Sequence, residues 1–279
     1  MFNSVGLVIR YDKKQALKLA KELAEYLRKE GLEIYIEDTL AGKVSFPAVT
    51  VPLEAMKTDF VITIGGDGTI LRTCLALPTP EPPILAVNMG VRGFLTEVEP
   101  KGACGAVERT LKGDFKIEKC AKLAVSTDGK MMPDALNDVV ISAGEPSKIL
   151  YTQICKNKEP ILKCQADGLI ASTQTGSTGY SLSAGGPVLD PEVNAFVLTP
   201  ICSLTVFRSL IFSADSKVTI EAIRPKEILV LIDGNYCQLV KSRKPMLTIT
   251  RSKNVTSFIR FKDDFYNRLR SRLLFKGMG

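Results

Sequence analysis

The amino-acid sequence predicts an α/β N-terminal domain, Rossmann-like with a mostly parallel sheet, joined to a β-rich domain of the β-sandwich kind. Three observations predict this fold class. Strand-like and helix-like segments alternate up to about residue 115, short β-like runs follow to about residue 251, and helical periodicity returns near the C-terminus. We therefore expect one domain over residues 1–115, joined by the C-terminal tail 252–279, and a second domain over residues 116–251.

The N-terminal domain is expected to begin with a strand and an amphipathic helix. The helix is predicted over residues 13–30, with Gly31 as its C-terminal stop. Its apolar residues recur at three- and four-residue spacing, and they are Leu17, Ala20, Leu23 and Leu27. Buried strands are predicted at 5–9, 32–36, 60–64 and 84–87, and two more helices at 69–76 and 102–111. This order predicts an open parallel sheet with ligands at the carboxyl ends of its strands.

The second domain is predicted from short apolar runs separated by turn signals such as Asp128-Gly129 and Asp233-Gly234. The predicted strands are 123–126, 138–142, 151–155, 169–172, 217–223, 227–232 and 245–250, and a short helix is possible at 180–184. The tail helix over 265–275 has Phe265, Leu269 and Leu273 on one face, and we expect it to pack on the first domain. Its basic residues Arg268, Arg272 and Lys276 are expected to form a solvated face.

Composition excludes several classes of function. The chain has 279 residues, 45% of them hydrophobic, and no histidine, so no histidine base or histidine metal ligand is possible. The formal charge of +7 fits an anionic substrate, and no aromatic-interleaved basic motif suggests nucleic acid. Seven scattered cysteines without a CxxC pair favour a cytoplasmic setting, and no apolar run is long enough for a membrane span.

The stretch Gly65-Gly66-Asp67-Gly68-Thr69 is the most informative motif. It follows the predicted strand 60–64 and precedes a helix. Glycines let backbone N–H groups approach an anion, and the positive end of the helix dipole faces it. A carboxylate in such a turn suits phosphoryl transfer onto an alcohol, where it orients or deprotonates the hydroxyl or binds a magnesium ion on the phosphates. A purely structural turn is the alternative, but three glycines around one Asp after an apolar strand favour function.

Three further clusters are candidates for binding. Residues 88–94 follow the next predicted strand, so we expect them beside the glycine turn. Asn137-Asp138 precedes an apolar run, where turn chemistry alone could explain the pair. Residues 167–187 are dense in Ser, Thr and Gly around an embedded Tyr, which suits a polyhydroxylated, phosphate-bearing ligand, although such stretches are often plain loops.

In this order, the four clusters resemble the NAD kinase family, which phosphorylates the adenosine ribose 2′-hydroxyl of NAD to give NADP. The resemblance implies that Asp67 is the catalytic group. It implies a phosphate cradle, to which we add Arg72 one helical turn further on: Gly65, Gly66, Gly68, Thr69 and Arg72. It also implies NAD-binding positions, with Asn137 and Asp138 at the adenosine and Asp167 at the nicotinamide half: Phe94, Asn137, Asp138, Asp167, Thr175, Thr178, Gly179, Tyr180 and Ser183.

The sequence departs from the family pattern at several positions. Gln174 stands where the family often has Pro, and Gly179 where Ala is usual. Leu204 replaces a frequent His, and Asn235 follows Asp233-Gly234 where Gln is frequent. None of these changes removes the proposed catalytic carboxylate, although they bear on substrate contact and on the preference between NAD and NADH.

We expect direct transfer from ATP or inorganic polyphosphate, with Mg²⁺ or another divalent cation bound with the donor phosphates, because no set of carboxylates has the spacing of a dedicated metal site. A homodimer or homotetramer is implied by the resemblance. Two alternatives remain open at this point: a kinase for another alcohol, such as a lipid or a sugar phosphate, and a non-catalytic protein that senses NAD or NADP.

Overall fold

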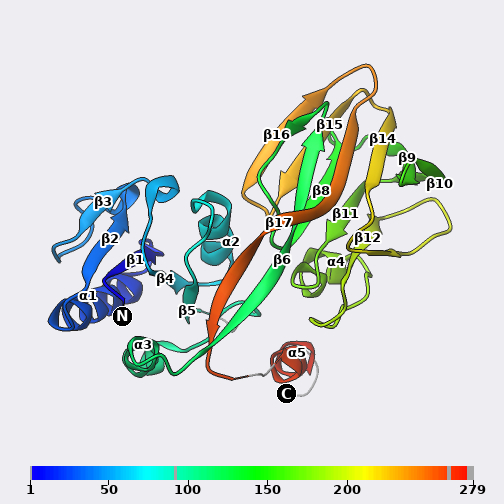
Figure 1. The fold of residues 1–279 in the computed structure, drawn as a ribbon. Helices are drawn as coiled ribbons and strands as arrows, with labels where there is room; N and C mark the ends of the chain where they lie inside the picture. The colour runs from blue at the N-terminus through cyan, green and yellow to red at the C-terminus, as the bar shows by residue number, and fades with distance from the viewer. Residues whose placement is uncertain (1, 91–92, 263–264, 275–279) are drawn as a thin grey trace. The chain divides into compact units, whose positions relative to one another are not determined.

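The structure is a computed structural model, and it describes residues 2–90, 93–262 and 265–274 (Figure 1). The chain divides into two compact units. The first unit comprises residues 1–120 and 256–279, and the second comprises residues 121–255. Two long strands, β6 (Lys116–Thr127) and β17 (Met246–Arg260), contribute residues to both units.

The first unit contains the parallel sheet that the sequence predicts. Its strands lie in the order β3-β2-β1-β4-β5, and Phe258 of β17 pairs with Ile84 on the outer side of β5. Every pairing in this series is parallel. The five strands are β1 (Ser4–Ile9), β2 (Glu33–Glu37), β3 (Val49–Val51), β4 (Phe60–Gly65) and β5 (Ile84–Asn88). Only the short, largely exposed β3 was not predicted.

Helices of the first unit follow the predicted segments closely. They are α1 (Lys14–Lys29), α2 (Asp67–Ala76), α3 (Ala103–Leu111) and α5 (Phe265–Leu274), with short 3₁₀ turns at Asp38–Leu40, Leu53–Ala55 and Pro100–Gly102. Gly31 has a positive φ of 85° just after α1, which confirms its predicted role as the stop.

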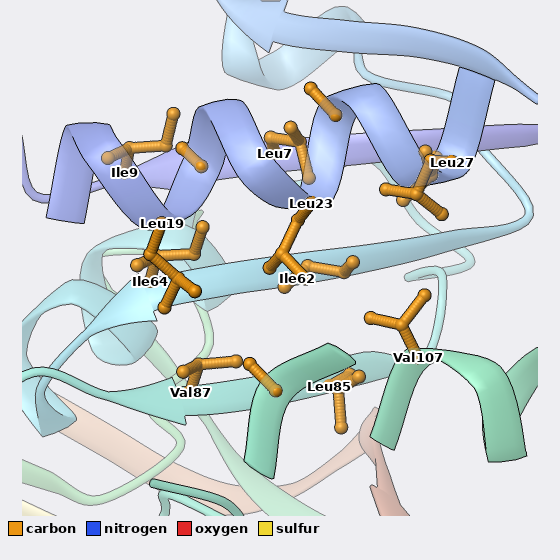
Figure 2. Close-up of a cluster of buried hydrophobic side chains, with 14 of the residues drawn as sticks. Leu7, Ile9, Leu19, Leu23, Leu27, Ile62, Ile64, Leu85, Val87 and Val107 are labelled. Atoms are coloured by element: carbon orange, nitrogen blue, oxygen red, sulfur yellow. The ribbon is translucent and has the colours of Figure 1, made fainter. Parts of the chain in front are cut away.

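The core of the first unit lies between the sheet and the apolar faces of α1 and α3. Side chains from these elements interdigitate there, and most of them are fully buried. Figure 2 labels Leu7, Ile9, Leu19, Leu23, Leu27, Ile62, Ile64, Leu85, Val87 and Val107. This packing holds β4 and β5 in register, so that Gly65 pairs with Asn88 and the loops after both strands leave the sheet side by side.

The second unit has a sandwich-like pair of antiparallel sheets. One is six-stranded, in the order β13-β12-β11-β8-β15-β16. Its strands are β8 (Asp138–Ala143), β11 (Gly168–Ser172), β12 (Ala195–Ile201), β13 (Leu210–Ser213), β15 (Glu227–Ile232) and β16 (Tyr236–Lys241). In the other sheet, the strands of this unit lie in the order β10-β9-β14-β17, and β6 pairs with β17 and with β7. The strands not yet given bounds are β7 (Lys130–Met131), β9 (Leu150–Lys156), β10 (Glu159–Ala166) and β14 (Val218–Arg224).

Five of these strands, β7, β10, β12, β13 and β16, were not predicted. β10 and β16 stand at the ends of their sheets, and only two residues of β10 and one of β16 are buried, so they lack the buried apolar run of a central strand. β12 contains Pro200, which argues against a central strand; the structure accommodates it beyond the end of β13, whose pairing with β12 covers only Ala195–Leu198. Positive φ angles at Asp233 (48°) and Gly234 (67°) confirm the predicted tight turn between β15 and β16.

The tail helix corrects one prediction. Arg268 does not lie on a solvated face: it is 7% exposed, and its Nη1 lies 3.7 Å from Glu97 Oε2. The side chains of Leu273, Arg272 and Lys276 fall outside the described part of the chain, as does the final residue of the predicted helix. None of the described helices combines the length and apolar character that crossing a bilayer requires.

Candidate functional site

The glycine turn joins β4 to α2 in the first unit. Gly65 is the last residue of β4, Gly66 is the N-cap, and Asp67 is the first residue of α2, two residues before the predicted start. The Gly66 carbonyl accepts hydrogen bonds from the N–H groups of Thr69 (2.9 Å) and Ile70 (3.2 Å). The turn therefore leads directly into the positive end of the α2 dipole, which favours an anion there.

The glycines of this turn have different roles. A Cβ at Gly65 would collide with the side chain of Thr69, which packs over it. A Cβ at Gly66 or Gly68 would meet no atom of the other described residues within 4 Å, their chain neighbours aside. The backbone of these two residues therefore borders open space, which allows a ligand to approach it closely.

The Asp67 carboxylate is held by the loop that follows β5. Its Oδ2 accepts a hydrogen bond from the N–H of Phe94 (2.9 Å), and its Oδ1 accepts one from the N–H of Leu95 (3.2 Å). Gly93 packs so closely that a Cβ there would overlap the carboxylate. Met89 N–H also donates to the Gly65 carbonyl (2.7 Å). This confirms that the second cluster lies beside the glycine turn, although residues 91 and 92 of it lie outside the described part of the chain.

Phe94 and Arg72 were predicted to contact ligands through their side chains. Phe94 is 8% exposed, and its backbone N–H is one of the two groups that hold the Asp67 carboxylate. Arg72 forms a two-pronged ion pair with the buried Glu37, with its Nη1 and Nη2 at 2.6 and 2.9 Å from the two carboxylate oxygens. That pair orients the guanidinium, which stays 39% exposed.

In the second unit, Asn137 and Asp138 stand at the start of β8. Three consecutive N–H groups, from Leu136 to Asp138, donate to the carboxylate of Asp233 at 2.7, 2.8 and 2.9 Å. Asp233 belongs to the tight turn after β15, which pairs with β8. Asp233 therefore sets the backbone position from which both predicted binding side chains project.

Both of those side chains are placed to receive a polar ligand. The Asp138 carboxyl is 7% exposed, and burial, with a smaller contribution from the charge of Asp233, raises its pKa to about 7. The Asn137 Oδ1 atom is buried and accepts no hydrogen bond from any described residue. A buried acceptor without a donor costs free energy, and a ligand N–H or O–H would remove that cost.

The Ser/Thr/Gly-rich segment packs against this pair. Thr173 Oγ1 donates to the Leu136 carbonyl (2.6 Å) and accepts from the N–H of Gly176 (3.0 Å). Gly176 lies so close to the Asn137 backbone that a Cβ would overlap its carbonyl. The structure thus brings the third and fourth sequence clusters together.

The hydroxyl groups of this segment are used mostly within the protein. Thr178 Oγ1 donates to the Thr175 carbonyl (3.1 Å) and Ser183 Oγ to the Gly179 carbonyl (3.5 Å), so both have capacity left only as acceptors. Tyr180 begins the short helix α4 (Tyr180–Ser183), and its side chain is 47% exposed. An exposed ring at this place can pack against a flat ligand group.

Asp167 is the predicted residue that the structure separates from this group. It precedes β11, whereas Asp138 pairs with Ser172 at the other end of that strand. At the usual rise along a strand, Asp167 and Ser172 are roughly 17 Å apart. Asp167 is exposed, and its N–H donates to the Ile201 carbonyl (2.9 Å).

Several of these contacts could not be read from local sequence. Glu37, Asp233 and the residues that support the 93–95 loop lie far along the chain from the groups that they hold. The Asp233-Gly234 pair predicted a turn. Nothing in the neighbouring sequence indicated that the Asp233 carboxylate binds the backbone at the start of β8. Among the described residues, no group of three or more Cys, Asp or Glu side chains is arranged to hold a metal ion.

Comparison with known proteins assigns both units. Residues 5–115 match the family model described as the ATP-NAD kinase N-terminal domain, and residues 136–261 match the ATP-NAD kinase C-terminal domain. An NAD kinase of Methanothermobacter thermautotrophicus is 36% identical over 277 residues, covering 98% of this chain and 97% of its own. An NAD kinase of Thermococcus sibiricus is 38% identical over 267 residues, covering 94% and 95%.

Two solved structures are similar. The crystal structure of yeast NADH kinase complexed with NADH covers all of this chain and 89% of its own, with a TM-score of 0.91; at 23% identity it supports the fold alone. An NAD kinase from Archaeoglobus fulgidus in complex with ATP covers 97% of this chain and 99% of its own, with a TM-score of 0.78 and 26% identity.

Proposed function

Since the chain belongs to the NAD kinase family and is a phosphotransferase that acts on NAD, we propose that Asp67 is the residue that orients and deprotonates the ribose 2′-hydroxyl. The new bond joins the ribose O2′ to the transferred phosphorus, and the bond between that phosphorus and the donor's bridging oxygen breaks. The hydroxyl proton passes to the Asp67 carboxylate, and the products are NADP and the shortened donor.

The observation that carries this proposal is the fixed carboxylate at the start of α2. Two backbone N–H groups orient it, one at each oxygen, which fixes the direction of the carboxylate at the start of the helix. Phosphoryl transfer passes through a loose transition state, so positioning and charge stabilisation supply most of the rate. Gly66 and Gly68 border open space at the helix N-terminus, which suits the donor phosphates. Gly65 and Thr69 give the turn its shape, and Arg72, held by Glu37, is our candidate for a further phosphate contact.

The adenosine half of NAD is assigned to Asn137 and Asp138. The buried Asn137 Oδ1 can accept a hydrogen bond from the adenine amino group. The Asp138 carboxyl can pair with ribose hydroxyls, and Tyr180 offers an exposed ring for packing. The nicotinamide contact of Asp167 and the ligand contacts of Thr175, Thr178, Gly179, Ser183 and Phe94 stay predictions.

ATP is the donor that we propose first, because a relative of known structure was crystallised in complex with ATP. Inorganic polyphosphate is the second candidate. A divalent cation such as Mg²⁺ would bind mainly to the donor phosphates, since the described residues form no cluster of metal ligands and Asp67 is the carboxylate in the glycine turn. The metal would neutralise charge on the phosphoryl oxygens during transfer.

We also propose a cytoplasmic location and a homodimer or homotetramer. The seven cysteines are scattered along the chain without a CxxC pair, which suits a reducing compartment. The two alternatives from the sequence, a kinase for a lipid or sugar phosphate and a non-catalytic sensor, find no support among the relatives, which are NAD kinases.

The test is NADP formation from NAD by the wild type and by Asp67→Asn, with ATP or polyphosphate as donor, each with and without Mg²⁺. We expect kcat of Asp67→Asn to fall by about 10²- to 10⁴-fold, as for loss of a general base, with the Kd for NAD nearly unchanged. Asp59→Asn is a matched control. Asp59 also accepts backbone N–H bonds in the first unit, from Asn3 (2.6 Å) and Ser4 (2.9 Å), but lies outside the glycine turn. Near-full kcat in Asp67→Asn would refute the assignment.

A further inference from the structure

A buried charge cluster lies behind the loop that holds Asp67. Arg260, the last residue of β17, is 5% exposed, and its Nε lies 2.6 Å from Glu118 Oε2. Its Nη1 lies 3.2 Å from Glu97 Oε2. Glu97 Oε2 is also 3.7 Å from Arg268 Nη1, and Glu97 Oε1 accepts the N–H of Phe261 at 2.8 Å.

Arg260 also makes a hydrogen bond to an uncharged partner. Arg260 Nη1 also donates to the backbone carbonyl of Leu95 at 2.8 Å. The N–H of the same residue donates to Asp67 Oδ1. Leu95 is therefore held on its N–H side by the Asp67 carboxylate and on its carbonyl side by the Arg260 guanidinium.

We infer that Arg260 is a positioning residue for Asp67: it fixes the 93–95 loop, and through it the direction of the catalytic carboxylate. The inference rests on the catalytic role proposed for Asp67. The loop contains Gly93, whose backbone touches the carboxylate, so a shift of the loop is transmitted to Asp67 directly. Beyond Leu95, the chain is tied to β5 by the N–H of Glu97, which donates to the Ala86 carbonyl at 2.8 Å.

The burial of Arg260 supports a positioning role over simple stabilisation. Taking charges out of water is costly, and a buried ion pair adds little net stability compared with apolar packing. What a buried arginine supplies is direction, because its planar guanidinium presents N–H groups at fixed angles to several acceptors at once. Here those acceptors are two carboxylates and the carbonyl of Leu95.

The test compares Arg260→Lys with Glu118→Gln in the full chain. A lysine keeps the charge, but its single ammonium group lacks the planar set of N–H groups that bonds Glu118 and the Leu95 carbonyl at the same time. We therefore expect kcat to fall at least about tenfold, with the Kd for NAD within twofold of wild type. Glu118→Gln weakens the same cluster but leaves the bond from Arg260 to Leu95 in place. We expect it to lower the melting temperature while kcat stays within about twofold.

A double-mutant cycle separates positioning from a structural role. If Arg260 acts through Asp67, Arg260→Lys lowers kcat in the wild type but not in an Asp67→Asn background. Additive losses of kcat, or unchanged kcat in folded Arg260→Lys, would overturn the inference. If Arg260→Lys does not fold, Glu97→Gln takes its place, because it removes the charge that holds the Nη1 atom of Arg260. We then expect the same fall in kcat with an unchanged Kd for NAD, and additive losses or an unchanged kcat would again overturn the inference. Failure of the proposed function is distinguishable, because Asp67→Asn alone would then keep its activity.

Discussion

Replacing Asp138 with asparagine should stabilise the protein at neutral pH and weaken its binding of NAD. Asp138 is 7% exposed, and no hydrogen bond from another described residue offsets the burial of its carboxyl group. Burial, and to a smaller extent the charge of Asp233, raises its pKa to about 7. An asparagine has nearly the same shape but carries no charge to desolvate.

The sign and size follow from linkage between folding and protonation. In the unfolded chain, Asp138 ionises with the ordinary pKa of 3.8, whereas in the folded protein it ionises only near pH 7. Between these values the folded state binds the extra proton, so the contribution of Asp138 to the free energy of unfolding decreases as pH rises. Below about pH 4 the carboxyl is protonated in both states, and the cost of burying its charge vanishes. Above pH 7 it is complete, at roughly 4 kcal/mol for a pKa difference of this size.

The assay is urea unfolding of wild type and Asp138→Asn over a series of pH values from about 4 to about 8. Circular dichroism is the suitable signal because the chain has no tryptophan. We expect the two proteins to match near the acid end and Asp138→Asn to become the more stable one as pH rises. A stability difference that does not change with pH would refute the reasoning.

Binding of NAD should follow the opposite trend. Ribose hydroxyls donate to an ionised carboxylate more strongly than to a neutral one, by about 1 kcal/mol or more per bond. The Kd of the wild type for NAD should therefore decrease as pH rises through about 7, and that of Asp138→Asn should be higher and lack this dependence. Isothermal titration calorimetry measures both, and a wild-type Kd that is flat across this range would contradict the assignment of Asp138 to the ribose.

Two glycine substitutions test the site geometry further. Gly93→Ala places a methyl group against the Asp67 carboxylate, so kcat should fall about 10- to 100-fold with little change in the Kd for NAD; a near-normal kcat would refute the close contact. Gly176→Ala overlaps the Asn137 carbonyl, so the Kd for NAD should rise and the free energy of unfolding should fall by about 1–3 kcal/mol. Gly105→Ala, with open space around its Cβ, is the control for both and should leave kcat and Kd unchanged.

The sequence was sufficient for elements whose signal is local. The apolar face of α1 and its stop at Gly31 follow from spacing and from the one residue that adopts a positive φ easily. The glycine turn was located correctly because it combines an apolar strand, three glycines and a carboxylate. Its helix began two residues earlier than predicted, since Asp67 and Gly68 are acceptable in a first turn although neither is a strong helix former.

Local signals failed where a residue's environment depends on distant parts of the chain. No strand was predicted where β12 lies. This strand contains Pro200, which it tolerates because the pairing with β13 ends at Leu198. Arg268 looked solvated from its spacing on the tail helix, yet it is buried beside Glu97. A periodic pattern reports which residues share a face, but it does not report what that face packs against.

The sequence by itself determined the alternation of strands and helices in the first unit, the glycine turn with its carboxylate, and the resemblance that names the reaction. The tertiary structure decided which groups hold the predicted site residues: Glu37 for Arg72, Asp233 for Asn137 and Asp138, and Arg260 with Leu95 for Asp67. The physical reason is range. A turn or a helix is set by neighbours within a few residues, whereas these partners lie 28 to 165 positions apart and meet only when the sheets have formed.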